Sequence, residues 1–193
     1  MIELQSPEAL RVGDWTGGSQ KWYPTWVRRM SGCGPTNAAL QVWYLARTRA
    51  ALAGLCEVGA GGKAEFQRLM ADLFPYVKPG RRGVDTPEKF SDGLERYCAA
   101  HGVSLSFAVL PDWEAVPEAL RADLPVAFLN LHSGSQKHMD DWHWLTLVAC
   151  DPARGAARCC DQGRTQEFSL RDWAATTKRG GAFVALNPTK SFD

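Results

Sequence analysis

Cys33 is the residue whose surroundings best suit nucleophilic chemistry. It lies in the segment GCGPTNAA, residues 32–39, where a proline followed by helix-forming residues predicts that the cysteine occupies the first turn of a helix. The unpaired N–H groups of a helix N-terminus stabilise a thiolate, which is the reactive form of cysteine. The flanking glycines are expected to let the backbone of a substrate approach closely. The competing interpretation is a turn that docks a small apolar side chain in the core, as buried cysteines commonly do.

A nucleophilic thiol needs a base, and the four histidines differ in their contexts. His101 precedes a glycine at a predicted helix end, while His132 and His138 border a polar loop. His143 instead begins an apolar segment that predicts a strand, and a strand end can hold an imidazole rigidly. We therefore expect His143 to serve Cys33 as its base, the alternative being a hydrogen-bonded core histidine.

A third group should orient the imidazole through its other ring nitrogen. Asp151 lies eight residues along the same strand, which is about 26 Å at the usual rise per residue and too far to reach. A turn centred on Ala153 would place His143 opposite Gly163, with Asp161 one diagonal away on the same face. This register predicts Asp161 as the orienting residue. A shift of one residue in the turn would reverse the parity, and Asp161 is otherwise explained as a turn former.

An oxyanion formed during acyl transfer needs hydrogen-bond donors that are already in place. The backbone N–H of Cys33 is one candidate. Gln20 is the only Gln or Asn between Gln5 and Cys33, so its side-chain amide is the candidate for the second donor. The alternative is that Gln20 is an ordinary surface residue.

These residues require a helix that carries the cysteine and a sheet that carries the other two groups. Residues 1–32 show no sustained period and predict an irregular lead-in. The predicted helices are a buried one from residue 35 to 47, then 63–73, 86–100 and 113–122. The predicted strands are 103–109, 124–132, 142–150, 157–161, 165–170 and 181–186. Helices followed by strands predict an α+β fold with an antiparallel sheet, in a single domain spanning 1–193.

Composition narrows the classes of partner. Lys and Arg number 22 against 21 Asp and Glu, so no broad field draws the chain to nucleic acid, and no nucleic-acid partner is expected. No apolar run approaches the ~20 residues of a membrane span, and the N-terminus lacks the pattern of a secretory signal. We expect a cytoplasmic protein, or one exported by a route that needs no classical signal peptide. The six cysteines are dispersed and form no C-x-x-C pair, which favours reduced thiols and no metal site.

Taken together, the quoted residues resemble the bacterial C39-like group of papain-like cysteine peptidases. The likeness rests on GCGPTNAA at 32–39, on His143 followed by an apolar strand, and on Asp161-Gln-Gly on a further strand. It covers about residues 20 to 175 in order of elements, although its specific part is one motif and two spaced positions. Two features depart from the group's pattern: Trp142 stands where a glycine is common before the histidine, and Gln20 is displaced to thirteen residues before Cys33.

The resemblance implies a papain-like fold in which Cys33, His143 and Asp161 are nucleophile, base and orienting residue, with no metal or organic cofactor. It implies hydrolysis of an amide bond in a peptide or protein substrate through a thioester. Deamidase, transglutaminase and amidase chemistry use the same residues and remain open, as does a binding module without turnover. An inhibitor or immunity partner is neither indicated nor excluded.

Overall fold

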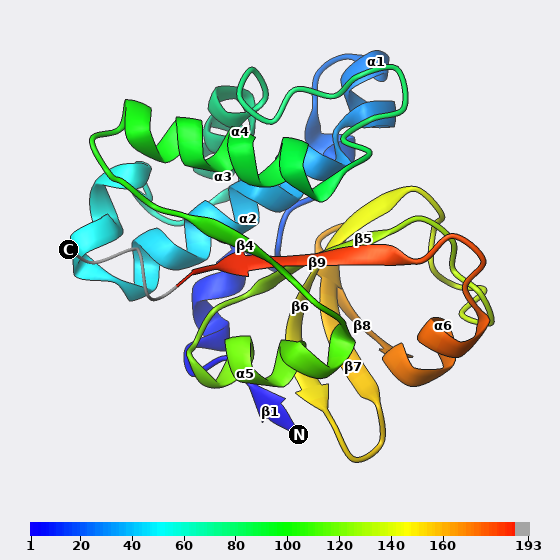
Figure 1. The fold of residues 1–193 in the computed structure, drawn as a ribbon. Helices are drawn as coiled ribbons and strands as arrows, with labels where there is room; N and C mark the ends of the chain where they lie inside the picture. The colour runs from blue at the N-terminus through cyan, green and yellow to red at the C-terminus, as the bar shows by residue number, and fades with distance from the viewer. Residues whose placement is uncertain (188–193) are drawn as a thin grey trace.

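The computed structural model describes residues 1–187, and the last six residues of the predicted domain 1–193 lie outside the described part. The fold is α+β, as the sequence predicts. Helices α2, α3 and α4 gather in the upper part of Figure 1, and the sheet lies below them together with α5 and α6. Within residues 1–187 the buried apolar side chains form one connected core that is shared by both parts.

The helices of the described chain agree with the predicted ones in its middle and differ from them near both ends. They are α1 (Trp26–Ser31), α2 (Cys33–Thr48), α3 (Lys63–Leu73), α4 (Pro87–Ala100), α5 (Val116–Arg121) and α6 (Leu170–Thr176). Four short 3-10 turns accompany them, η1 (Pro7–Leu10), η2 (Gln20–Trp22), η3 (Ala50–Leu55) and η4 (Trp113–Ala115). The prediction for α3 is confirmed at both ends, whereas the helix expected over 113–122 is divided between η4 and α5. None of the helices in residues 1–187 has the length and apolarity needed to cross a bilayer.

Helix α2 is the centre of the fold, as its composition predicts. Every residue from Cys33 to Ala46 is buried, and the helix packs against β6 (His143–Asp151), α3 and η3. A helix that is covered on all sides needs small or apolar residues around its whole circumference, and the alanines of this segment satisfy that need. The helix begins at Cys33, two residues before the expected start, so the cysteine is its first residue.

Within residues 1–187 one antiparallel sheet of seven strands carries the second half of the chain. The strands are β1 (Ile2–Glu3), β4 (Phe107–Leu110), β5 (Val126–Asn130), β6, β7 (Ala156–Asp161), β8 (Arg164–Ser169) and β9 (Gly181–Leu186). Their order is β4-β9-β5-β6-β7-β8, with β1 paired beside β6. A separate two-stranded ribbon is formed by β2 (Arg11–Val12) and β3 (Trp15–Thr16).

Several strand predictions are wrong at their ends, including the one over 124–132, of which only β5 (Val126–Asn130) is a strand. The strand expected from residue 103 begins only at Phe107. The strand expected to run through Leu170 stops at Ser169, because the Ser169 hydroxyl accepts a hydrogen bond from the Asp172 N–H at 3.1 Å and caps α6. The serine cap starts helix α6, which the alternating pattern of β8 does not predict.

The register between β6 and β7 is the feature on which the predicted site depends. Near the hairpin turn Asp151 pairs with Ala156, so the turn is longer by one residue than a turn centred on Ala153. An irregularity between Leu147 and Ala149 then shifts the register, and Thr146 pairs with Cys160. A β-bulge inserts one unpaired residue into a strand and so changes the alignment by one position. The bulge restores the predicted register at the end of the strands where His143 and Asp161 lie.

Candidate functional site

Cys33 is held at the junction of α1 and α2 by close packing. Gly32 caps α2, and a Cβ added there would lie 2.5 Å from the Tyr23 ring. A Cβ added at Gly34 would lie 2.6 Å from Cγ2 of Val84. The glycines are therefore required by contacts within the protein itself, and the expectation that they let a substrate backbone approach closely stays a prediction. Cys33 retains 8% exposure.

Replacing Gly34 with alanine should destabilise the protein by about 1–3 kcal/mol, because the new methyl group has no room beside Val84. Urea unfolding measures this difference directly. Gly54→Ala is the matched control, since a Cβ there meets nothing within 4 Å, and its expected change is about zero or slightly stabilising. Equal effects of the two substitutions would contradict the packing argument.

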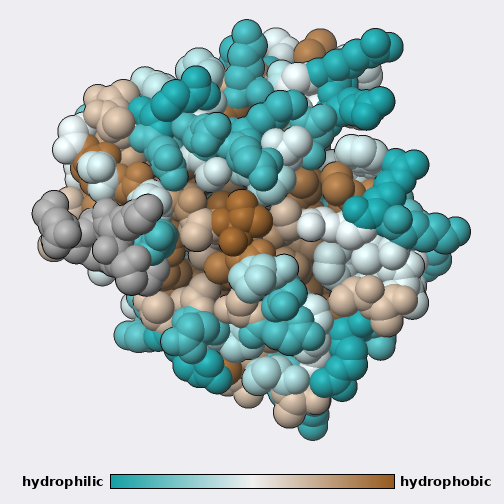
Figure 2. All heavy atoms as spheres, viewed as in Figure 1, coloured by the Kyte–Doolittle hydropathy of each residue, from teal (hydrophilic) through white to brown (hydrophobic). Residues whose placement is uncertain are grey.

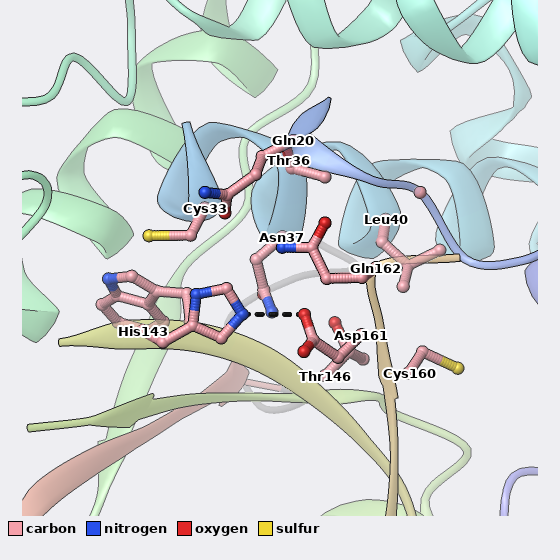
Figure 3. A pocket seen from close by; sticks show the side chains of 12 residues that line it. Gln20, Cys33, Thr36, Asn37, Leu40, His143, Thr146, Cys160, Asp161 and Gln162 are labelled. Atoms are coloured by element: carbon pink, nitrogen blue, oxygen red, sulfur yellow. Dashed lines mark hydrogen bonds and ion pairs between the residues drawn. The ribbon is translucent and has the colours of Figure 1, made fainter. Parts of the chain in front are cut away.

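His143 and Asp161 meet at the ends of adjacent strands. Nε2 of His143 lies 2.7 Å from Oδ1 of Asp161, and the His143 residue is 5% exposed. The second carboxylate oxygen accepts a longer hydrogen bond, of 3.4 Å, from the Gln166 amide. Figure 3 shows the other ring nitrogen of His143, Nδ1, on the side of the Cys33 sulfur. The structure therefore brings the three residues together in the order cysteine, histidine, aspartate.

The N-terminal segment fixes the turn that carries Asp161. Gln162 and Gly163 both have positive φ, 50° and 80°, in the two-residue turn between β7 and β8, which is the geometry of a type I′ hairpin. The Gly163 N–H donates to the Gly18 carbonyl at 2.9 Å, and the Ser19 hydroxyl donates to Oε1 of Gln162 at 2.6 Å. Asp161 is thus both a strand end and a turn residue, and the two interpretations of the sequence are compatible.

The charges of Cys33 and His143 favour a thiolate beside an imidazolium. Burial raises the pKa of the Cys33 thiol, but the hydrogen bond and positive charge of His143, together with N–H groups of Trp144 and Gly34, lower it below the ordinary 9.0. Burial likewise lowers the pKa of His143, but the hydrogen bonds and charges of Asp161 and Cys33 outweigh it and raise the pKa to about 10. An interval of pH therefore exists in which both groups are charged.

The other cysteines provide the contrast. In the described chain all six cysteines are free thiols. Burial raises the pKa of Cys56 and Cys150 to about 11 and of Cys98 and Cys160 to about 12, and it raises that of Cys159 further. Only Cys33 among them combines a lowered pKa with a histidine partner, which is the condition for a reactive thiol.

Gln20 lines the same small cavity as Cys33 and His143. Its Nε2 donates to the Arg29 carbonyl at 2.7 Å, which holds the amide in place and leaves a second N–H on the same nitrogen. Figure 3 shows this amide beside Cys33. The cavity has a volume of about 20 Å³, room for about one water molecule. Gln20 and Cys33 lie at the edge of this cavity, where the Gln20 amide and the Cys33 backbone N–H would be able to donate hydrogen bonds to a developing oxyanion.

Asn37 is a member of the site that sequence reasoning missed. It lies four residues after Cys33 on α2, hence on the same face of the helix, and it is 5% exposed. Figure 3 shows its side chain reaching from α2 toward the His143–Asp161 pair, and its Oδ1 has no hydrogen-bond partner within residues 1–187. The helical spacing from Cys33 was the signal that could have identified it.

The tryptophans near the site divide into core and surface. Trp144 is buried, donates its indole N–H to the Val84 carbonyl at 2.6 Å and stacks on Phe90. Trp22 is partly buried and packs edge-on against Phe66, so it lies against the core. Trp142 is different: it precedes His143, is 40% exposed and has a φ of 56°, a left-handed conformation that side chains other than glycine rarely adopt.

Within residues 1–187 no group of three His, Cys, Asp or Glu side chains lies close enough together to hold a metal ion. The site consists instead of one thiol, one imidazole, one carboxylate and several amides. Comparison of the sequence with models of known protein families, and with functionally characterised proteins, gives no match.

Proposed function

We propose that this protein is a papain-like cysteine hydrolase that cleaves an amide bond in a peptide or protein through a thioester. The observation that carries the proposal is the chain of contacts from Cys33 through His143 to Asp161, with the pKa of the thiol lowered and that of the imidazole raised. A buried cysteine used only for packing has the opposite pKa shift, as the other five show. Perturbation of this kind in a recess is typical of functional groups.

The reaction begins when Sγ of Cys33 attacks the carbonyl carbon of the scissile amide. A C–S bond forms, and the oxyanion is stabilised by the Cys33 N–H and the free N–H of Gln20. The C–N bond then breaks as Nδ1 of His143 gives its proton to the leaving nitrogen, which departs as an amine. Water attacks the thioester and gives a proton to His143, the C–S bond breaks, and the acid and the thiolate are released.

The resemblance to the C39-like group supports this proposal from the sequence side. The group places its cysteine at the head of the central helix, its histidine on the sheet and its Asp or Asn on the next strand, and the elements carrying Cys33, His143 and Asp161 occur in that arrangement. The glycine common before the histidine has a physical counterpart in the positive φ of Trp142.

Deamidation of a glutamine side chain is the second candidate. The observation in its favour is the small opening, since Cys33 and His143 are 8% and 5% exposed and the cavity beneath them has room for about one water. A single extended side chain fits such an opening more easily than a folded main chain. Its leaving group would be ammonia in place of an amine.

A trapped acyl-enzyme distinguishes these outcomes. The protein is mixed with a peptide digest of a cell extract, quenched in acid after seconds and analysed by intact-mass and peptide mass spectrometry. The proposal expects an acyl adduct on Cys33, with new carboxyl termini in the digest for peptide hydrolysis, or Gln-to-Glu conversion for deamidation. A Cys33 that stays unmodified over a range of extracts contradicts both candidates.

Asp161→Asn should lower kcat/KM by about 10²–10⁴-fold, because the amide no longer stabilises the imidazolium or fixes the ring. The carboxylate raises the pKa of His143, so its loss lowers that pKa and moves the alkaline limb of the pH profile to lower pH. Asp151→Asn is the control, since within residues 1–187 the Asp151 carboxylate accepts hydrogen bonds only from its own turn, and the pH profile of this variant should keep the parent's limbs. An unchanged alkaline limb in Asp161→Asn would argue against the pairing.

A further inference from the structure

A surface hollow of about 730 Å³ is lined by Arg82, Trp142 and Arg179. Trp142 is the residue immediately before His143. Arg82 comes from the loop before α4 and Arg179 from the loop before β9, so three distant segments meet there. Figure 2 shows the surface indented at the right of the view, with hydrophilic residues on both sides, where Figure 1 places α1 and the loop before α4 above the segment that enters β6.

The wall that carries Arg82 lies directly over the head of α2. Two residues after Arg82, the Val84 side chain occupies the space beside Gly34, and the Val84 carbonyl accepts the Trp144 indole N–H. The opposite wall begins with Trp142, adjacent to His143. One wall of the hollow therefore lies two residues from Val84, which packs against the residue after Cys33. The other wall lies next to His143 in the chain.

The indole of Trp142 is held at the surface at an energetic cost. Its φ of 56° lies in a region that costs about 1–3 kcal/mol for an ordinary residue, and its side chain is 40% exposed. The guanidinium of Arg179 lies over the ring, 5.4 Å from its centroid, and orients it. An exposed aromatic ring on a strained residue next to the proposed base is more readily explained by binding than by stability.

The two arginines are available to a ligand. Both are exposed, and within residues 1–187 neither guanidinium has an ion pair or a hydrogen bond to another group. Asp85, which is close enough to feel the charge of Arg82, is already paired with Lys89. No carboxylate lines the hollow, so it presents two positive charges that the described part of the chain does not neutralise.

We propose that the Arg82–Trp142–Arg179 hollow binds a carboxylate of the substrate beside the scissile amide, on the leaving-group side. The inference rests on the proposed function. Planar guanidinium groups pair with carboxylates through two parallel hydrogen bonds, and the indole adds a flat apolar contact for the carbon chain that bears the acid. Since Nδ1 of His143 gives its proton to the leaving nitrogen, the residue preceding His143 lies on the leaving half. The carboxylate belongs either to an acidic side chain or to a free C-terminus.

Alkylation of Cys33 tests this inference without requiring turnover. Two matched pairs of probes are used, each reacting as Sγ displaces iodide. N-Iodoacetyl-aspartic acid α-amide is compared with N-iodoacetyl-asparagine α-amide for a side-chain carboxylate. N-Iodoacetylglycine is compared with N-iodoacetylglycinamide for a terminal carboxylate. Second-order rate constants at Cys33 are measured by peptide mass spectrometry, at low and high salt.

The expected result is that the acidic member of at least one pair reacts about threefold to tenfold faster, and that the preference shrinks in high salt. Arg82→Gln and Arg179→Gln should each reduce the ratio of the acidic-probe rate to the neutral-probe rate toward one. Arg154→Gln, which removes the same charge at the opposite end of β6, should preserve it. The pair that shows the preference identifies the source of the carboxylate.

Two results would overturn the inference, and they differ in what else they overturn. If Cys33 reacts readily but no acidic probe is preferred, or the preference survives both arginine substitutions, the hollow does not bind carboxylate and the hydrolase proposal stands. If Cys33 reacts with none of the four probes at neutral pH, the thiol is not nucleophilic, and the proposed function fails with the inference.

Discussion

Replacing Cys33 with serine is expected to reduce amide hydrolysis by about 10⁴-fold or more, to the level of the uncatalysed reaction plus binding effects. A serine hydroxyl keeps the shape of the side chain, but it does not ionise beside His143 as the thiol does. The packing of the α2 N-terminus is retained, so the protein should unfold at the same urea concentration as the parent. The measurement is the rate of substrate loss for a peptide identified from the trapped adduct.

Cys56→Ser is the matched control for this substitution. Cys56 is a free thiol at the end of η3, its pKa is raised by burial, and it does not line the cavity of Cys33. Its replacement should leave the rate within about twofold, as substitutions away from a functional site commonly do. A Cys33→Ser variant that retains most of its activity, beside a normal Cys56→Ser, would show that another group carries the reaction.

His143→Gln is expected to have the second largest effect, because one residue serves three functions. It supplies the charge that lowers the pKa of Cys33, it protonates the leaving nitrogen, and it activates water for the second step. Loss of all three should reduce turnover by about 10³–10⁶-fold. Glutamine fills a comparable volume and can still hydrogen-bond Asp161.

The pH dependence separates the effect of His143 on the pKa of Cys33 from its role in proton transfer. In the parent, Cys33 reacts with iodoacetamide above its lowered pKa, and turnover declines as pH rises through about 10, where His143 loses its proton. Without His143 burial dominates the thiol, so its pKa rises and alkylation at neutral pH slows by about tenfold or more. His101→Gln, at the end of α4, should leave the alkylation profile unchanged. A normal profile in His143→Gln would show that the imidazole does not ionise the thiol.

The elements near Cys33 follow from local signals. The alanine-rich stretch after GCGPTN, the apolar stripe of α3 and the Thr86-Pro87 start of α4 each contain their own start signal or period, so their positions follow from residues within a few turns. The same dependence on local signals explains why the sequence does not predict helices α1 and α6. Their caps, Thr25 and Ser169, lie in segments whose wider pattern indicates loop and strand.

The contact between His143 and Asp161 agrees with the predicted register, although the turn that joins their strands differs from the predicted one. A turn centred on Ala153 predicts the right diagonal, yet the observed turn is longer and Asp151 pairs with Ala156. The irregularity between Leu147 and Ala149 compensates for the difference. A bulge has no sequence signature strong enough to predict, because it depends on which backbone groups of β1 and β7 lie beside it.

From the sequence alone follow the α+β class, the helix headed by Cys33 and the strands that carry His143 and Asp161, because these rest on local patterns within single elements. Only the tertiary structure decides the rest. It places Gln20 beside Cys33 through contacts with Arg29, shows that the flanking glycines accommodate Tyr23 and Val84, and brings Arg82 and Arg179 to Trp142. These contacts join residues far apart in the chain, and their geometry is set by how whole elements pack, which no local period encodes.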